Sequence, residues 1–108
     1  MYGIIGSIVA VTGMGQELKH ILLEAADALR AVEGCLSFVV AEDPDSPDIV
    51  WVTEVWQSET DHAASLDTPA VQSIVATGRP FIEGFGDRTV TKPLGGVGLP
   101  EESQSERP

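Results

Sequence analysis

The chain has few basic residues. Lysine and arginine together number 6, against 17 aspartates and glutamates, and the formal net charge at pH 7 is −11 over 108 residues. Nucleic-acid binding relies on clustered basic side chains that displace counterions from phosphates. Anionic membrane surfaces attract proteins through similar basic clusters. The charge balance therefore argues against both kinds of partner.

Cysteine and long apolar runs are equally scarce. The single cysteine, Cys35, excludes an internal disulfide and suits a reducing compartment. No apolar run approaches the ~20 residues of a membrane-spanning helix. The first residues have no basic flank and already alternate like a strand, so they do not indicate a signal peptide. We therefore expect a cytoplasmic protein with no membrane partner.

The usual cofactor and metal motifs are also missing. The glycines form neither a phosphate loop nor a dinucleotide fingerprint. His20 and His62 fall on different predicted elements, and with one cysteine they are too few for a four-ligand zinc site. Asp43, Asp45 and Asp48 resemble a calcium loop without its glycine and distal glutamate, which favours a solvated hairpin turn. We expect neither cofactor nor metal.

Hydropathy patterns divide the first half of the chain into a strand, a helix and two more strands. An apolar stripe at steps of three and four predicts an amphipathic helix from Leu18 to Val32, with Lys19 on its polar side and Gly34 as a left-handed cap. The run of β-branched and aromatic residues at 49–56 is the strongest strand signal. Predicted strands therefore cover 3–11, 35–41 and 49–56, with a solvated loop at 42–48.

The second half predicts two short helices and a weaker strand. Ser58 and Asp61 resemble a capping box that starts a helix over 60–66, and Thr68 followed by Pro69 starts another that ends at Gly78. A final strand is predicted at 87–93. The order β-α-β-β-α-β is that of a ferredoxin-like α+β fold. We expect one domain over residues 1–99 and a disordered tail at 100–108.

The predicted strands are apolar on both faces. In the first strand, Ile4 and Ile8 alternate with Ile5 and Val9. A sheet with one solvated face should alternate apolar with polar residues, and two helical segments can cover only one face. A second copy of the same sheet is the simplest cover for the other face, so we expect a homodimer through sheet faces.

The strand at 49–56 also carries the best candidate site. Alternation places Glu54 and Trp56 on one face, and His62 lies in the helix that follows. A carboxylate within an apolar strand is costly unless it is paired or poised for chemistry. These three residues could form an aromatic pocket with an acid or base. Alternatively, Trp56 belongs to the core, Glu54 pairs with Arg79 or Arg88, and His62 is solvated.

The other candidate side chains favour ordinary roles. Cys35 opens a strand directly after a glycine, which favours a small buried hydrophobe over a reactive thiol. His20 lies off the apolar stripe of its helix, which favours a surface histidine.

Several short segments resemble one family. Glu-Gly-Cys-Leu-Ser-Phe at 33–38, Thr-Glu-Val-Trp at 53–56 and Thr-Pro-Ala at 68–70 are similar, in order and spacing, to the antibiotic biosynthesis monooxygenases. The resemblance implies a dimeric α+β barrel. It also implies oxidation of a quinol or aromatic polyketide anthrone by O₂ without metal or flavin. The catalytic residues would then be His62, Trp56 and Glu54.

The family's site residues match only in part. Trp56 occupies the tryptophan position of the anthrone-oxidising branch, and His62 stands where that branch has a tyrosine. Val52 replaces its asparagine, and Ser65 stands where many quinol-type members carry a histidine. The haem-degrading branch matches less well, because Gly6 stands where it needs an asparagine. The alternative function is a non-catalytic dimeric domain of the same fold that binds a small molecule or regulates.

Overall fold

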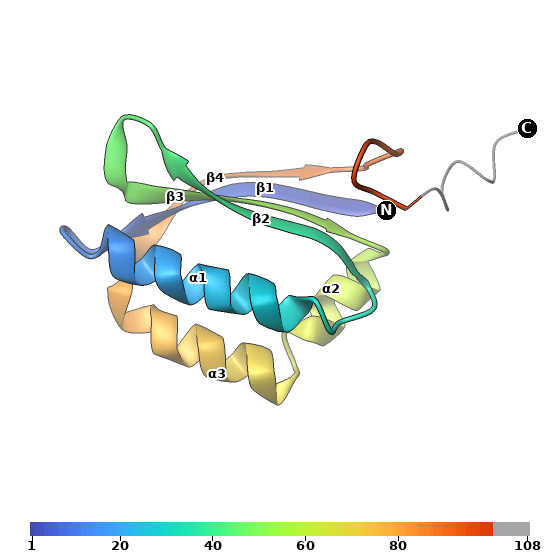
Figure 1. The fold of residues 1–108 in the computed structure, drawn as a ribbon, viewed down its shortest axis with the longest axis horizontal. Coiled ribbons are helices and arrows are strands. Elements are labelled where there is room, and N and C mark those ends of the chain that lie inside the picture. Colours follow the sequence, from blue (N-terminus) through green and yellow to red (C-terminus); the bar gives the residue numbers. More distant parts are fainter. Residues whose placement is uncertain (101–108) are drawn as a thin grey trace, which may run out of the picture.

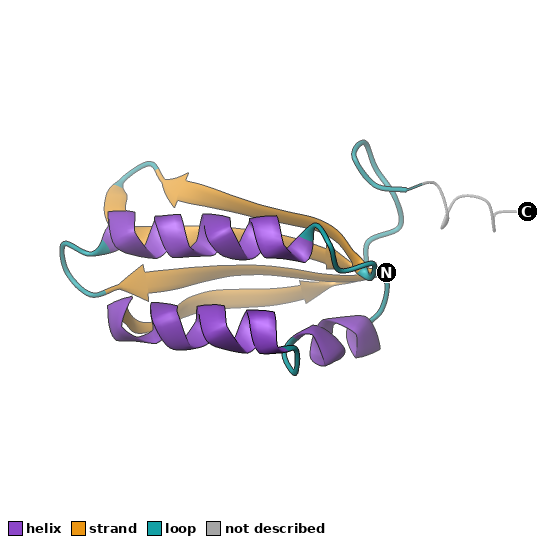
Figure 2. Ribbon diagram, turned by 60° about the horizontal axis from the view of Figure 1, so that its bottom comes forward, coloured by secondary structure: helices purple, strands orange, loops and turns teal. Residues whose placement is uncertain are grey.

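The computed structural model describes residues 1–100 as a four-stranded antiparallel sheet with helices on one face. The strands lie in the order β2-β3-β1-β4. Both ribbon views place every helix on the same side of the sheet, so its other face carries no helix (Figures 1 and 2). In chain order the elements are β1 (Tyr2–Ala10), α1 (Gly15–Leu29), β2 (Cys35–Asp43), β3 (Ser46–Trp56), α2 (Glu59–Ser65), α3 (Pro69–Gly78), a 3₁₀ turn (Arg79–Phe81) and β4 (Ile82–Thr91).

This arrangement confirms the predicted ferredoxin-like α+β fold, including the division of the second helical segment into two. Both predicted caps form: Ser58 Oγ accepts from the Asp61 amide at 3.1 Å, and Thr68 Oγ1 accepts from the Val71 amide at 3.4 Å. Pro69 occupies the first turn of α3, where its missing N–H leaves no helical bond unmade. These caps fix where α2 and α3 begin relative to the end of β3.

The register of β1 against β3 decides which residues face the helices. Tyr2 pairs with Trp56, Ile4 with Glu54, and Gly6 with Val52. Side chains of such pairs lie on the same face of the sheet, and every second residue shares that face. Glu54 and Trp56 are two residues apart on β3, so both lie on the face of the sheet that the helices cover.

The core lies between this face of the sheet and α1. Leu18 of α1 packs with Ala10 and Val50, and all three are almost fully buried. Ile8, Leu22 and Val40 extend the cluster at its edges, where they are only partly buried. Full burial of a side chain such as Leu18 or Val50 contributes roughly 1.5–3 kcal/mol to stability. The core therefore anchors α1 firmly over β1 and β3, whereas the space toward α2 and α3 is less completely filled.

The predicted loop at 42–48 is wrong in extent, because the two strands run on to a short turn. β2 continues to Asp43 and β3 begins at Ser46. Two carboxylates of the segment expected to be a solvated loop make hydrogen bonds. Asp43 Oδ2 accepts from Trp51 Nε1 across the hairpin at 2.9 Å. Asp48 accepts from the backbone amides of Gly13 and Gly15, both at 3.1 Å, which satisfies donors at the start of α1.

Two features of the first helix also differ from prediction. Helix α1 ends at Leu29, and Gly34 has no positive φ, so it is not a left-handed cap. A Cβ at Gly34 would lie 2.6 Å from Cβ of Asp61, so a glycine is needed there for the close approach of α2. Lys19 is buried and does not lie on an exposed face. Its Nζ lies 3.3 Å from Oε1 of Glu42 on β2.

The last strand begins five residues earlier than predicted and runs over Ile82–Thr91. Its pairing with β1 shifts register between Gly6 and Ile8, where β4 has one extra residue and bulges. Such a bulge interrupts the period-two pattern from which strands are predicted, which explains the late start. The predicted tail lies outside the described residues, apart from Pro100. Within residues 1–100, the helices are too short or too polar to cross a membrane.

Candidate functional site

An apolar cavity of about 240 Å³, partly open to solvent, lies between the sheet and the three helices. Its walls come from aliphatic side chains of α1 and α3, and β3 forms part of its floor. Three polar or titratable side chains that line it come from β3 and α2: Glu54, His62 and Ser65. An apolar cavity with a few convergent polar groups is the usual form of a small-molecule site.

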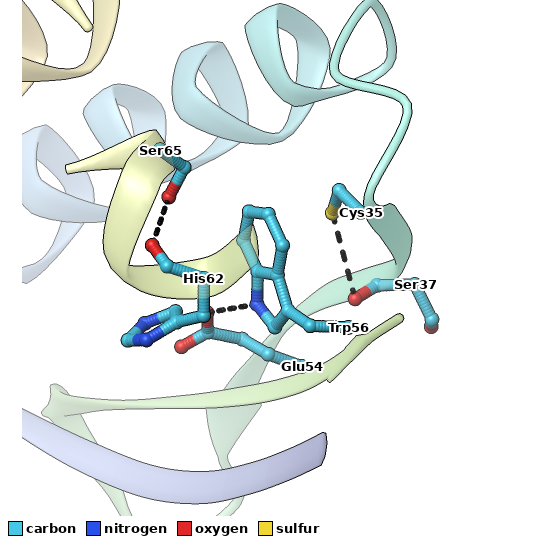
Figure 3. Close-up of polar contacts among 6 residues, drawn as sticks. All are labelled: Cys35, Ser37, Glu54, Trp56, His62 and Ser65. Carbon is cyan, nitrogen blue, oxygen red and sulfur yellow. Dashed lines mark hydrogen bonds and ion pairs between the residues drawn. The ribbon is translucent and has the colours of Figure 1, made fainter. Parts of the chain in front are cut away.

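Glu54 and Trp56 are joined by a hydrogen bond at this end of the cavity (Figure 3). Trp56 Nε1 donates to Oε1 of Glu54 at 3.0 Å. Trp56 is only 1% exposed, and a buried indole N–H needs an acceptor. The carboxylate in the apolar strand therefore has a definite partner, and it holds the indole ring in place beside the cavity.

His62 completes a compact group of three side chains. Its Nε2 lies 3.9 Å from Oε1 of Glu54, too long for a hydrogen bond but close enough for attraction when the imidazole is protonated. Its ring meets Trp56 edge-on, with centroids 5.4 Å apart and planes at 70°. The side chains of His62 and Glu54 are 18% and 17% exposed, so their interaction is only weakly screened by water.

The structure thus brings together the three side chains that the sequence singled out. The alternative arrangement is partly correct, since Trp56 is part of the buried interior. In the described residues, Glu54 interacts with Trp56 and His62, and not with Arg79 or Arg88 as that alternative expected. His62 is mostly buried and not solvated.

Two further side chains lie beside this group: Tyr2, which the sequence does not indicate, and Ser65, which the sequence marks only as a position where quinol-type members carry a histidine. Tyr2 also packs against His62, with ring centroids 5.6 Å apart. Its place follows from the alternation of β1, but only once the pairing of Tyr2 with Trp56 is known. Ser65 is buried beside the cavity, and its hydroxyl donates to the His62 carbonyl at 2.7 Å (Figure 3). That bond occupies the hydroxyl hydrogen within the same helix.

Cys35 lies next to the site but is poorly suited to be a nucleophile. It opens β2 opposite Trp56 and is partly buried. Burial raises the pKa of the Cys35 thiol, and the nearby negative charge of Glu54 raises it further. A thiol, unlike a thiolate, is unreactive, so the structure agrees with the predicted inert cysteine.

The remaining histidine and the aspartate cluster do not form a second site. His20 is exposed on α1 and contacts Glu24 one turn later at 3.1 Å, as expected for a surface histidine. The indole N–H of Trp51 lowers the pKa of Asp43, and the Asp45 amide lowers it further. Across residues 1–100 there is no group of three or more histidine, cysteine or acidic side chains placed to hold a metal.

The fold recurs in proteins of known structure. A protein of Chloroflexus aurantiacus, provisionally named an antibiotic biosynthesis monooxygenase, is 45% identical. The alignment covers 92% of this chain and 98% of that one, with a TM-score of 0.84. A similarly named protein of Deinococcus radiodurans is 22% identical over 90% of this chain and 96% of its own, with a TM-score of 0.75, which shows the shared fold.

Sequence comparison leads to the same family. No curated protein matches the chain. The sequence profile of the antibiotic biosynthesis monooxygenases, however, matches residues 1–77, which include β1 to β3, α2 and nearly all of α3. The matched part contains Tyr2, Glu54, Trp56 and His62. The chain therefore belongs to the antibiotic biosynthesis monooxygenase family.

Proposed function

We propose that this protein is a cofactor-independent monooxygenase that oxidises a quinol or a related hydroxylated aromatic compound with O₂. The observation that carries the proposal is an apolar cavity with a carboxylate, an imidazole and an indole gathered at one end. An apolar wall suits an aromatic ring, and the imidazole can accept the proton of a ring hydroxyl.

The size of the cavity supports a small aromatic substrate. A protein cavity of about 150 Å³ holds one benzene ring, so a cavity of about 240 Å³ accommodates roughly two fused rings. The buried indole of Trp56 forms a rigid boundary at one end of the cavity. A hydroxyl at the edge of the ring would then face Glu54 and His62.

The proposed reaction begins with proton transfer from the substrate hydroxyl to the neutral imidazole of His62. The negative charge of Glu54, 3.9 Å away, stabilises the imidazolium that forms. The electron-rich anion passes one electron to O₂, and the aryl radical and superoxide combine at a ring carbon. Protonation gives a hydroperoxide, which loses water. A quinol and O₂ thereby yield a hydroxyquinone and water, with one oxygen atom in each product.

Oxygen consumption with a panel of hydroquinones, naphthohydroquinones and anthrones tests this proposal. His62→Ala should lower turnover by about 10²–10⁴-fold, the usual effect of losing a positioned acid–base group. His20→Ala is the matched control and should retain full turnover, because His20 is exposed on α1 and does not line the cavity. Wild-type turnover in His62→Ala would show that His62 is not the base.

A second function is supported by two positions near the site, Val52 on β3 and Ser65 on α2. Val52 is buried where one branch of the family has an asparagine, and a valine side chain neither donates nor accepts a hydrogen bond. Ser65 stands where other members have a histidine, and its hydroxyl donates within its own helix. These differences support a domain that binds an aromatic molecule without oxidising it. Ligand binding without oxygen consumption across the whole panel would favour this function.

We also propose that the protein forms a homodimer through the face of the sheet that carries no helix. Ile5 and Val39 are 40% and 54% exposed there, and they lie in the same cross-strand row, joined through Thr53 of β3. Monomeric proteins seldom leave a large contiguous apolar surface in water. A second sheet with the same pattern would cover these side chains on both subunits.

A further inference from the structure

A second cavity adjoins the proposed substrate site on the same face of the sheet. It measures about 200 Å³ and shares Ile8, Glu54 and Phe85 with the first cavity. It extends along β1 and β4, away from the helices, over Ile4, Gly6 and Arg88. Because the two cavities share walls at Glu54, a ligand held at Glu54 and His62 can reach into the second cavity.

Gly6 keeps the floor of this second cavity open. It lies in the row between Val52 and Arg88, where a side chain would project from the helix-facing side of the sheet. A Cβ at this position would have one close neighbour, the Asp87 carbonyl oxygen at 3.4 Å, which is ordinary van der Waals contact. The backbone therefore does not demand a glycine here, and the missing side chain leaves space for a ligand.

Arg88 supplies the positive charge of the second cavity. It is the only lysine or arginine among the lining residues. Within residues 1–100 its side chain takes part in no hydrogen bond or ion pair, whereas Lys19 and Arg30 are both paired with carboxylates. An unpaired guanidinium beside a cavity, in a protein of net charge −11, is suited to bind a carboxylate or carbonyl group of a ligand.

We infer that Gly6 and Arg88 form a second subsite that selects hydroxylated aromatic substrates bearing an acidic or carbonyl substituent. The inference rests on the proposed function of the first cavity. The ring hydroxyl lies at Glu54 and His62, and the substituent extends over Gly6 to the guanidinium of Arg88. Glu54 on β3 pairs with Ile4 of β1, and Arg88 on β4 pairs with Gly6. Two strand spacings across and two residues along place their backbones roughly 12 Å apart, and because both side chains extend into the space between, a two-ring spacer can bridge them.

Two probes that differ by one carboxylate test the subsite. Quenching of tryptophan fluorescence is measured with 2-naphthol and with 6-hydroxy-2-naphthoate at constant ionic strength. The wild type should bind the carboxylate roughly five- to tenfold more tightly, a modest preference because Arg88 is partly screened by water. Without the subsite, the acidic protein would repel the carboxylate, and 2-naphthol would bind as well or better.

Variants assign the preference to the two residues. Arg88→Gln should abolish it and leave 2-naphthol binding unchanged, whereas Arg79→Gln, an exposed arginine outside both cavities, should preserve it. Gly6→Val should fill the second cavity and weaken the carboxylate probe alone, and Gly6→Ala should do so to a smaller extent.

The outcomes separate this inference from the proposed function. Equal binding of both probes to the wild type, or an unchanged preference in Arg88→Gln, overturns the subsite and leaves the first cavity as a binding site. Binding of 2-naphthol without binding of the carboxylate probe likewise overturns the subsite alone, whereas failure of both probes to bind overturns both proposals.

Discussion

The hydrogen bond between Trp56 and Glu54 can be tested by replacing Glu54 with leucine. Leucine fills similar space but leaves the indole N–H of a side chain that is 1% exposed without its acceptor. An unsatisfied buried donor costs about 1–3 kcal/mol of stability, and relief from burying a carboxylate offsets part of that. We therefore expect Glu54→Leu to lower the free energy of unfolding by about 1–2 kcal/mol.

A double-mutant cycle isolates this contribution. Glu54→Leu, Trp56→Phe and the double variant are unfolded with urea at one protein concentration, so that any dimer dissociation is equal in all samples. In the double variant no indole N–H is left unpaired, so the two effects should be less than additive by about 1–2 kcal/mol. Glu54→Gln retains an acceptor and should unfold close to the wild type.

Activity divides the roles of Glu54 further. If the carboxylate supports the His62 imidazolium, Glu54→Gln should keep stability but lose turnover, since the amide carries no charge. A Glu54→Leu variant as stable as the wild type, together with additive effects in the cycle, would refute the claim that this bond holds Trp56 in place.

Two other features give predictions about assembly and acid stability. Val9→Asp, on the face of the sheet without helices, should shift sedimentation from a dimer of about twice 11.4 kDa toward monomer or aggregate, whereas Val97→Asp, in the exposed C-terminal loop, should not. A wild-type monomer at micromolar concentration would contradict the proposed dimer. The bond from Trp51 to Asp43 lowers the pKa of that carboxyl, so the stability it contributes is present above its ordinary pKa and lost as pH falls through the lowered pKa. Asp43→Asn should therefore unfold with less dependence on pH between about pH 2 and 5, measured by thermal melting; an unchanged pH dependence would show that the bond contributes little.

Local patterns determined the elements and part of the site. Alternation placed Glu54 and Trp56 on one face of a strand, and the cap at Ser58 set the start of the helix that carries His62. Both signals act within a few residues, because side-chain direction in a strand and capping of a helix are local properties. For the same reason the three residues could be grouped before their distances were known.

Only the tertiary structure decided which distant groups meet. Asp48 binds the start of α1, Lys19 reaches Glu42 on β2, and Tyr2 lies against His62, all through contacts between segments far apart in the chain. The open space over Gly6 beside Arg88 depends on the register of β4 and its bulge. A sequence pattern states which way a side chain points, whereas the partner it meets is set by strand register and packing of the whole fold.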